Sequence, residues 1–145
     1  MKLEDIQNLW KEDVNFVDDM LDEEALKIPR LHQKYYKVYT TEKLLLRKLE
    51  ADLKIYQQIK YEYYAGELAE EDLREHGWEP FPKKVLRADI PRHVDSDRQV
   101  IERTLKIAHQ KEKVDFCDAI IKSLRDRGFL IKSAIDWRKF TNGAI

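Results

Sequence analysis

Residues 30–64 read RLHQKYYKVYTTEKLLLRKLEADLKIYQQIKYEYY, and this stretch contains neither glycine nor proline. It carries all seven tyrosines of the chain together with a row of lysines and arginines. Because glycine and proline are the residues that most often interrupt helices, the stretch predicts one helix of about 50 Å at a rise of ~1.5 Å per residue. A helix of that length needs partners along its flank.

Apolar residues recur along this stretch in steps of three and four, which places them on one side of the predicted helix. Glu42 and Asp52 interrupt the seam, so the pattern favours a packed helical assembly over an isolated two-stranded coiled coil. The seam consists of Val38, Leu45, Leu49, Tyr56, Ile59 and Tyr63.

Charge is distributed unevenly, although the net charge of the chain is only −1. Residues 27–60 hold nine basic and three acidic side chains, a balance of +6, whereas residues 1–24 hold two basic and nine acidic side chains, a balance of −7. A basic helix face interleaved with aromatic rings is typical of single-stranded nucleic acid binding, with cations on phosphates and rings on bases. The same pattern also fits a solvated charged face above tyrosines that belong to the core.

Composition predicts a single all-α domain, or one domain with an arm, within the 145 residues. Four glycines and four prolines leave little material for the turns of a sheet-rich fold. The single cysteine, Cys117, excludes an intramolecular disulfide. Since no apolar run approaches ~18 residues, we expect neither a transmembrane span nor a signal peptide, and therefore a soluble intracellular protein.

The flanks of the long helix carry further signals. Residues 3–17 predict a short amphipathic helix, and residues 18–24 predict an acidic linker. Pro29 fits best in the first turn of the long helix, where its missing N–H is harmless, and Gly66 marks the end of that helix.

The middle of the chain predicts a connector. Residues 67–75 predict a short acidic helix, and residues 76–82 a rigid link that docks through Trp78 and Phe81. A basic segment follows, and its pattern does not distinguish a strand from a loop. Its cations are Lys83, Lys84, Arg87 and Arg92.

A second long helix is predicted to start at residues 95–99, where the Ser96 hydroxyl can cap the Gln99 N–H while the Gln99 side chain reaches back. It is predicted to run to Arg127 and to end at Gly128 in a left-handed cap. Residues 129–140 then predict a short apolar helix that folds back on its neighbour or inserts into another protomer, and residues 143–145 are expected to fray.

A seven-residue repeat on the second helix is typical of a coiled-coil seam, with Cys117 also on it. We expect this seam and the apolar C-terminal helix to assemble a homo-oligomer; packing within one protomer is the competing interpretation. The expected oligomerisation residues are Val100, Ile107, Val114, Ile121, Leu124, Phe129, Ile131, Ile135, Trp137 and Phe140.

Signals for catalysis are absent from the sequence. The four histidines lie on different predicted elements with no ligand spacing, and no glycine-rich loop could cradle a nucleotide, so we expect no metal and no cofactor. Cys117 on a helical seam reads as a small buried hydrophobe and not as a nucleophile. The interpretation is a protein that is not an enzyme; an enzyme whose site forms across protomers is a remaining rival.

Three short motifs stand out at the two ends and near the middle of the chain. The first is LEDIQ at residues 3–7, and the second is YYAG at residues 63–66. The third comprises Arg127, Gly128, Phe129, Ile131 and Lys132 with Asp136, Arg138 and Phe140. In order and spacing, which cover most of the chain, they resemble the start, the Tyr-Tyr-Ser-Gly turn and the terminal motif of the UvsY family of recombination mediators of T-even-like bacteriophages.

This resemblance implies a recombination mediator with roles in DNA recombination, repair and replication in the cytoplasm of an infected bacterium. Its implied partners are single-stranded DNA, the phage single-strand-binding protein and a RecA-like recombinase, which it loads. It also implies self-assembly into a ring-like homo-oligomer, a hexamer or heptamer. A helical scaffold that binds only protein is the alternative.

The family carries a basic residue, one spacer and a second basic residue shortly before the Tyr-Tyr-x-Gly turn, and these contact DNA. Here the second position is Lys60, but the first is Gln58, so one phosphate contact is missing or has moved to Lys54. The expected DNA-binding residues are Lys43, Arg47, Lys48, Lys54, Lys60, Tyr63 and Tyr64.

These signals predict four functional segments. Residues 1–24 form an acidic helix and linker, and residues 25–66 a DNA-binding helix. Residues 67–94 form the connector, and residues 95–145 the oligomerising helices.

Overall fold

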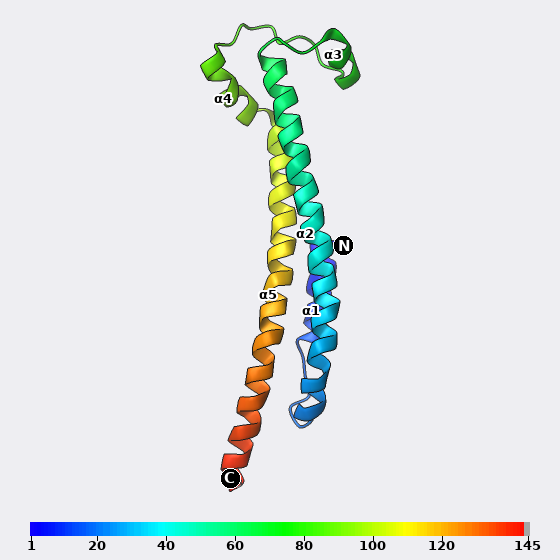
Figure 1. The fold of residues 1–145 in the computed structure, drawn as a ribbon, viewed down its shortest axis with the longest axis vertical. Coiled ribbons are helices and arrows are strands. Elements are labelled where there is room, and N and C mark those ends of the chain that lie inside the picture. Colours follow the sequence, from blue (N-terminus) through cyan, green and yellow to red (C-terminus); the bar gives the residue numbers. More distant parts are fainter. Residues whose placement is uncertain (144–145) are drawn as a thin grey trace. The chain divides into compact units, whose positions relative to one another are not determined.

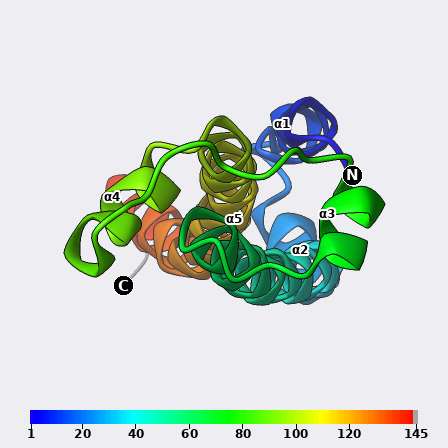
Figure 2. The same cartoon turned by 90° about the horizontal axis from the view of Figure 1, so that it is seen from above.

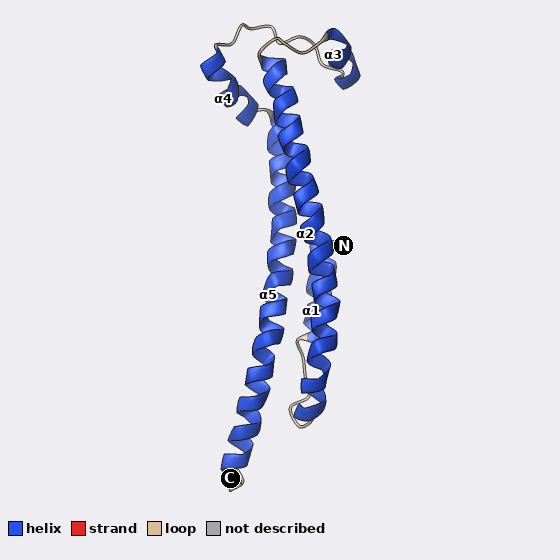
Figure 3. Cartoon of the chain, in the orientation of Figure 1, coloured by secondary structure: helices blue, strands red, loops and turns tan. Residues whose placement is uncertain are grey.

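The structure is a computed structural model that describes residues 1–143, and within that range it contains helices and no strand (Figures 1 and 3). The all-α prediction is confirmed. The helices are α1 (Leu3–Asp13), α2 (Leu21–Tyr64), α3 (Glu70–His76), the 3₁₀ turn η1 (Arg87–Asp89), α4 (Ile90–Asp95) and α5 (Arg98–Thr141). The expected fraying of residues 143–145 falls partly outside the described residues.

Contacts group the chain into two compact units. Unit 1 combines residues 1–45 with the chain from Gln110 onward, and unit 2 comprises Leu46–His109. Both α2 and α5 contribute residues to each unit. These units do not follow the four functional segments expected from sequence, which stay a prediction.

The predicted long helix is α2, and its 44 residues exceed the expectation at the N-terminal end. The prediction of an acidic linker through Glu24 is wrong, because Asp22, Glu23 and Glu24 form the first turn of the helix. Carboxylates there interact favourably with the exposed N–H groups of a helix start. Pro29 consequently lies inside α2 and not in its first turn. The helix ends as predicted, with Gly66 in the left-handed region at φ +74°.

The predicted break at Gly128 is wrong, because α5 continues without interruption to Thr141. Gly128 does not have a positive φ, and a Cβ built on it would lie 3.9 Å from Ile28 Cδ1. A glycine inside a helix costs only about 1 kcal/mol, which burial of the flanking Leu124 and Ile131 can offset. The segment 129–140 is therefore the end of α5 and does not fold back as a separate helix.

The predicted start of α5 is also corrected. Asp97, and not Ser96, caps the helix: its Oδ1 accepts hydrogen bonds from the N–H groups of Gln99 at 2.9 Å and Val100 at 3.1 Å. The Ser96 hydroxyl instead donates to the Arg92 carbonyl at 2.8 Å, within the last turn of α4.

The core of unit 1 is built by α1 against parts of α2 and α5 (Figures 1 and 2). Ile6 of α1, Tyr35 of α2 and Leu124 of α5 are fully buried together with Cys117 and Ile120. The Trp10 ring meets Tyr35 edge to face at a centroid distance of 5.6 Å. The amphipathic helix predicted over residues 3–17 is shorter than expected, since α1 ends at Asp13.

Arg127 ties α5 to the end of α1 in unit 1. Its guanidinium donates to the carbonyls of Asp13 and Val14, each at 3.0 Å. These are carbonyls that a helix end leaves without intrahelical partners, and a cation beside them also interacts favourably with the helix dipole. Arg127, the first residue of the terminal sequence motif, thus has a structural role in holding α5 against the end of α1.

The core of unit 2 is formed by Tyr56, Ile90, Val94 and Val100, with Trp78 packed against them. The docking expected for Trp78 is confirmed, and Phe81 lies against Tyr64 at a centroid distance of 4.9 Å. In both views α3 and α4 lie on either side of the C-terminal end of α2 (Figures 1 and 2). The expectation of an extended or loose segment through Arg92 is wrong from Arg87 on, where η1 and α4 begin.

The seven-residue seam of α5 packs inside the protomer, which was the competing interpretation. Val114 and Leu124 are buried in unit 1, and Val100 is buried in unit 2. Ile107 and Ile121 are half-buried, while Ile131 is buried. Val100, Val114, Leu124 and Ile131 thus belong to the protomer's own packing, whereas an oligomer contact at the half-buried Ile107 and Ile121 stays a prediction. Of the remaining expected oligomer residues, Ile135 is half-buried and Phe129, Trp137 and Phe140 are exposed.

Candidate nucleic-acid interface

Lys60, the family's basic position, is buried in unit 2. Its ammonium lies 3.1 Å from Asp97 Oδ2, and the two side chains are only 6% and 7% exposed. The same ammonium lies 3.8 Å from the centre of the Trp78 ring, so the ring closes off one side of it. A cation paired and covered in this way cannot hold a phosphate without breaking the pair. The prediction of Lys60 as a phosphate contact is corrected: it is a structural residue.

Asp97 is the centre of this buried network. Burial alone would raise the pKa of its carboxyl, but hydrogen bonds from the Tyr64 hydroxyl and the Val100 N–H, together with the Lys60 ammonium, hold that pKa below its ordinary value. The carboxylate therefore stays ionised and compensates the charge of Lys60. Asp97 combines this role with capping α5, a pairing that no local sequence pattern indicates.

Tyr63 and Tyr64, the rings expected to stack on bases, are both engaged within unit 2. The Tyr64 hydroxyl donates to Asp97 Oδ2 at 2.7 Å, and the Tyr63 hydroxyl donates to the Glu79 carbonyl at 2.7 Å. Both rings also pack edge-on against Phe81. Each is half-buried by these contacts. Both tyrosines thus join the connector to the end of α2, and their stacking on bases stays a prediction.

The remaining predicted cations lie on the surface of α2. In unit 2, Arg47, Lys48 and Lys54 are exposed, and no acidic group of the described residues lies within 4.0 Å of any of them. In unit 1, Lys43 is half-buried and its ammonium donates to the Tyr39 hydroxyl at 3.0 Å. Arg47, Lys48 and Lys54 are thus the predicted cations that the structure leaves most available to a polyanion.

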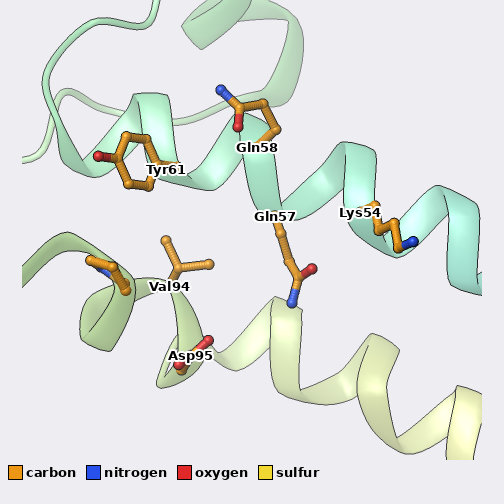
Figure 4. Close-up of a pocket in the computed structure, with 7 residues that line it drawn as sticks. Lys54, Gln57, Gln58, Tyr61, Val94 and Asp95 are labelled. Atoms are coloured by element: carbon orange, nitrogen blue, oxygen red, sulfur yellow. The ribbon is translucent and has the colours of Figure 1, made fainter.

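A groove of about 370 Å³ between α2 and α4 adjoins Lys54 (Figure 4). The α2 wall is formed by Lys54, Gln57, Gln58 and Tyr61. Gln57 extends from α2 across the groove (Figure 4). The opposite wall is formed by Pro91, Val94 and Asp95. Cation, ring and carboxylate thus line one open groove, whereas the Gln58 amide points away from α4 (Figure 4).

Sequence reasoning missed the residues of this groove other than Lys54 and Gln58. Counted from Lys54, the other α2 residues of the groove lie three, four and seven positions further on, which places all four on one helix face. The sequence therefore contained the pattern for the α2 wall. The α4 wall could not be found, because that segment was expected to be extended or loose.

Two further classes of site find no support. No group of three or more His, Cys, Asp or Glu side chains within residues 1–143 is placed to hold a metal ion. None of the helices in that range is long and apolar enough to cross a membrane.

Comparisons with known proteins agree on one family. A family model described as "Recombination, repair and ssDNA binding protein UvsY" matches residues 9–144. The recombination protein UvsY of Enterobacteria phage T4 is 26% identical over 143 residues, covering 99% of each chain. These matches confirm the resemblance that the sequence motifs indicated.

Solved structures give the same result. One crystal structure of the bacteriophage T4 recombination mediator protein UvsY, lattice type IV, matches with a TM-score of 0.83 and 25% identity, covering 97% of this chain and 99% of that one. A second, lattice type II, matches with a TM-score of 0.84 and 25% identity, covering 98% of each chain.

Proposed function

The chain belongs to the UvsY family of recombination, repair and single-stranded DNA-binding proteins, and from this premise we propose that it loads a RecA-like recombinase onto strand covered by the phage single-strand-binding protein. The observation that carries the proposal is the exposed basic face of α2 in unit 2. It is formed by Arg47, Lys48 and Lys54, and no acidic group in the described part of the chain lies within 4.0 Å of them. This function needs no catalytic group, and the protein would act in the cytoplasm of the infected host.

The proposed mechanism rests on many weak contacts. Cations at the ends of flexible side chains bind phosphates without reading sequence, which suits a protein that must act on any strand. If several protomers of a ring-like homo-oligomer, a hexamer or heptamer, each hold a short length of strand, avidity makes up for modest single contacts. Wrapping the strand in this way would weaken its contacts with the single-strand-binding protein and admit recombinase.

The first prediction is that the basic face dominates the salt dependence of DNA binding. Each phosphate neutralised on a single strand contributes about −0.7 to the slope of log K against log salt. Combining Arg47→Ala, Lys48→Ala and Lys54→Ala should therefore flatten the slope by roughly 2 per engaged protomer. Fluorescence anisotropy with labelled single-stranded DNA at several salt concentrations measures this slope.

The matched control removes three exposed cations from α5, namely Lys106, Lys111 and Lys132. It loses the same total charge, so a specific path along α2 predicts a much smaller change for it. Equal slopes for the two triple variants would refute a DNA path on α2. Absence of any salt-dependent binding by the natural protein would favour the alternative, a helical scaffold that binds only protein.

Loading is tested separately from binding. Recombinase should assemble faster on strand already covered by single-strand-binding protein when this protein is added, and the α2 triple variant should lose that acceleration. Acceleration that survives in the triple variant would mean that loading does not depend on the basic face.

A further inference from the structure

The groove between α2 and α4 holds several polar groups that the fold itself leaves without partners (Figure 4). Lys54 and Asp95 both line it, and both are exposed. No ion pair within 4.0 Å joins either of them to another described residue. The Tyr61 ring is half-buried on the same surface, beside the apolar Val94. An unused cation, ring and carboxylate on one concave surface are groups that a ligand can engage.

The size and spacing of the groove fit one nucleotide. Its volume of about 370 Å³ lies within the range of small-ligand sites, roughly 300–1,000 Å³. Lys54 and Tyr61 are seven residues apart on α2, hence about 10 Å along the helix. That separation is comparable with the reach of a nucleotide from its phosphate to the outer edge of its base.

Asp95 fixes the direction in which a nucleotide can lie. A carboxylate repels phosphate, so the backbone of a strand must pass at the Lys54 end and the base must face Asp95. The only favourable neighbours for an ionised carboxylate there are hydrogen-bond donors on the base. Adenine, cytosine and guanine each carry an exocyclic amino group, whereas the one donor on the thymine base edge, its ring N3–H, lies between two carbonyl oxygens that a carboxylate repels.

We propose that this groove is a subsite for one nucleotide of single-stranded DNA, in which Lys54 holds the phosphate, Tyr61 stacks on the base and Asp95 accepts a hydrogen bond from its exocyclic amino group. The inference rests on the proposed function and adds a base preference to it. Binding is then not uniform: strands rich in amino-bearing bases bind more tightly than thymine-rich strands.

The test compares oligo(dC) with oligo(dT), two flexible pyrimidine strands of equal length, by anisotropy at slightly alkaline pH and fixed salt. The natural protein should prefer oligo(dC) severalfold. Asp95→Asn should abolish this preference and also tighten binding to oligo(dT), because a repelling charge is lost while an amide can donate to the thymine carbonyls. Asp115→Asn, the same charge change on an exposed part of α5, should leave the preference unchanged.

A second pair of variants tests the ring. Tyr61→Phe keeps the stacking surface and should keep the affinity. Tyr61→Ala should weaken binding to both strands by roughly 5- to 150-fold per engaged site and leave the salt slope nearly unchanged. Because Tyr61 also packs against the unit 2 core, its variants are compared only after thermal melting shows them folded. Asp95→Asn is exposed and does not depend on this check.

The outcomes separate this inference from the proposed function. The subsite is overturned, and the proposed function left intact, if salt-dependent binding is tight but equal for oligo(dC) and oligo(dT). The same holds if the preference for oligo(dC) survives Asp95→Asn. A folded Tyr61→Ala variant with unaltered affinity overturns it too. Failure of the natural protein to bind either strand overturns both.

Discussion

Lys60 shows how one residue can match a family position and still have a different task. Its ammonium is enclosed by Asp97 and by the ring of Trp78. Lys60 lies on α2, Asp97 caps α5, and Trp78 belongs to the connector. Removing one partner of a buried ion pair leaves the other charge uncompensated, which costs about 3–5 kcal/mol in general. The position therefore contributes to the stability of unit 2.

We predict that Lys60→Ala lowers the free energy of unfolding by about 3 kcal/mol, measured by urea denaturation. Lys54→Ala removes the same kind of side chain from an exposed site and should change the free energy of unfolding by less than about 0.5 kcal/mol while weakening DNA binding. The two lysines should thus behave in opposite ways. A stable Lys60→Ala variant that binds DNA poorly would restore the phosphate contact expected from the family pattern.

The sequence identified Lys60 as special but could not predict its surroundings. A lysine six residues after Lys54 on a basic helix looks like a surface cation, because most lysines are exposed. What buries it is Asp97, which is far along the chain and was expected only to flank a Ser96 cap. The signal for Tyr61 was equally incomplete, since its partner wall is built by α4.

At the scale of elements, Gly66 and Gly128 were predicted to play the same part, and the structure separates them. Gly66 follows the end of α2 with φ +74°, whereas Gly128 lies inside α5 without a positive φ. A Cβ at Gly66 would meet nothing within 4 Å, and one at Gly128 would meet only Ile28 Cδ1 at 3.9 Å, an ordinary contact. Their substitutions therefore differ through the backbone alone.

We predict that Gly128→Ala raises the free energy of unfolding by about 0.5–1 kcal/mol, because alanine has the higher helix propensity and a less flexible unfolded chain. Gly66→Ala should lower it by about 1–2 kcal/mol, because the left-handed conformation strains a residue with a Cβ. Paired denaturation curves measure both changes. If Gly128→Ala is the destabilising one, α5 is interrupted at Gly128 as the sequence alone suggested.

The two glycines also mark the limit of local sequence signals. The absence of glycine and proline correctly predicted the body of α2, because nothing inside the stretch competes with helix formation. Two predictions gave a helix-breaking residue too much weight: the helix end at Gly128 and the helix start near Pro29. Tertiary burial decides whether a helix tolerates such a residue, and the local sequence does not show it. Glu42 is a similar case: it interrupts the apolar seam of α2, yet it is buried and accepts a hydrogen bond from the Gln110 side chain at 2.7 Å.

At the scale of the whole molecule, the chain supplies its own partner for much of the predicted coiled-coil seam, whereas among residues 1–143 the aromatic side chains in the last turns of α5 stay largely uncovered. The Trp137 and Phe140 rings stack at a centroid distance of 5.8 Å and are 64% and 75% exposed. Phe129 and Leu130 on the same helix are 69% and 66% exposed. Exposed apolar patches of this kind are typical of protein–protein contact surfaces. We therefore propose that the self-assembly expected from the sequence uses this end of α5.

The last prediction is that Trp137→Ala combined with Phe140→Ala lowers the oligomer mass, measured by light scattering at several protein concentrations. Loss of two exposed rings removes apolar area that only association can bury, so the melting of a dissociated protomer should change little. Deleting residues 129–145 is a poorer test, because it also removes the buried Ile131 and would destabilise unit 1. The matched control is Leu44→Ala with Leu105→Ala, which removes side chains 64% and 63% exposed elsewhere on the two long helices. An assembly that keeps its mass in the aromatic variant and loses it in the control would move the interface away from the end of α5, and the avidity on which strand binding depends would then need a different geometry.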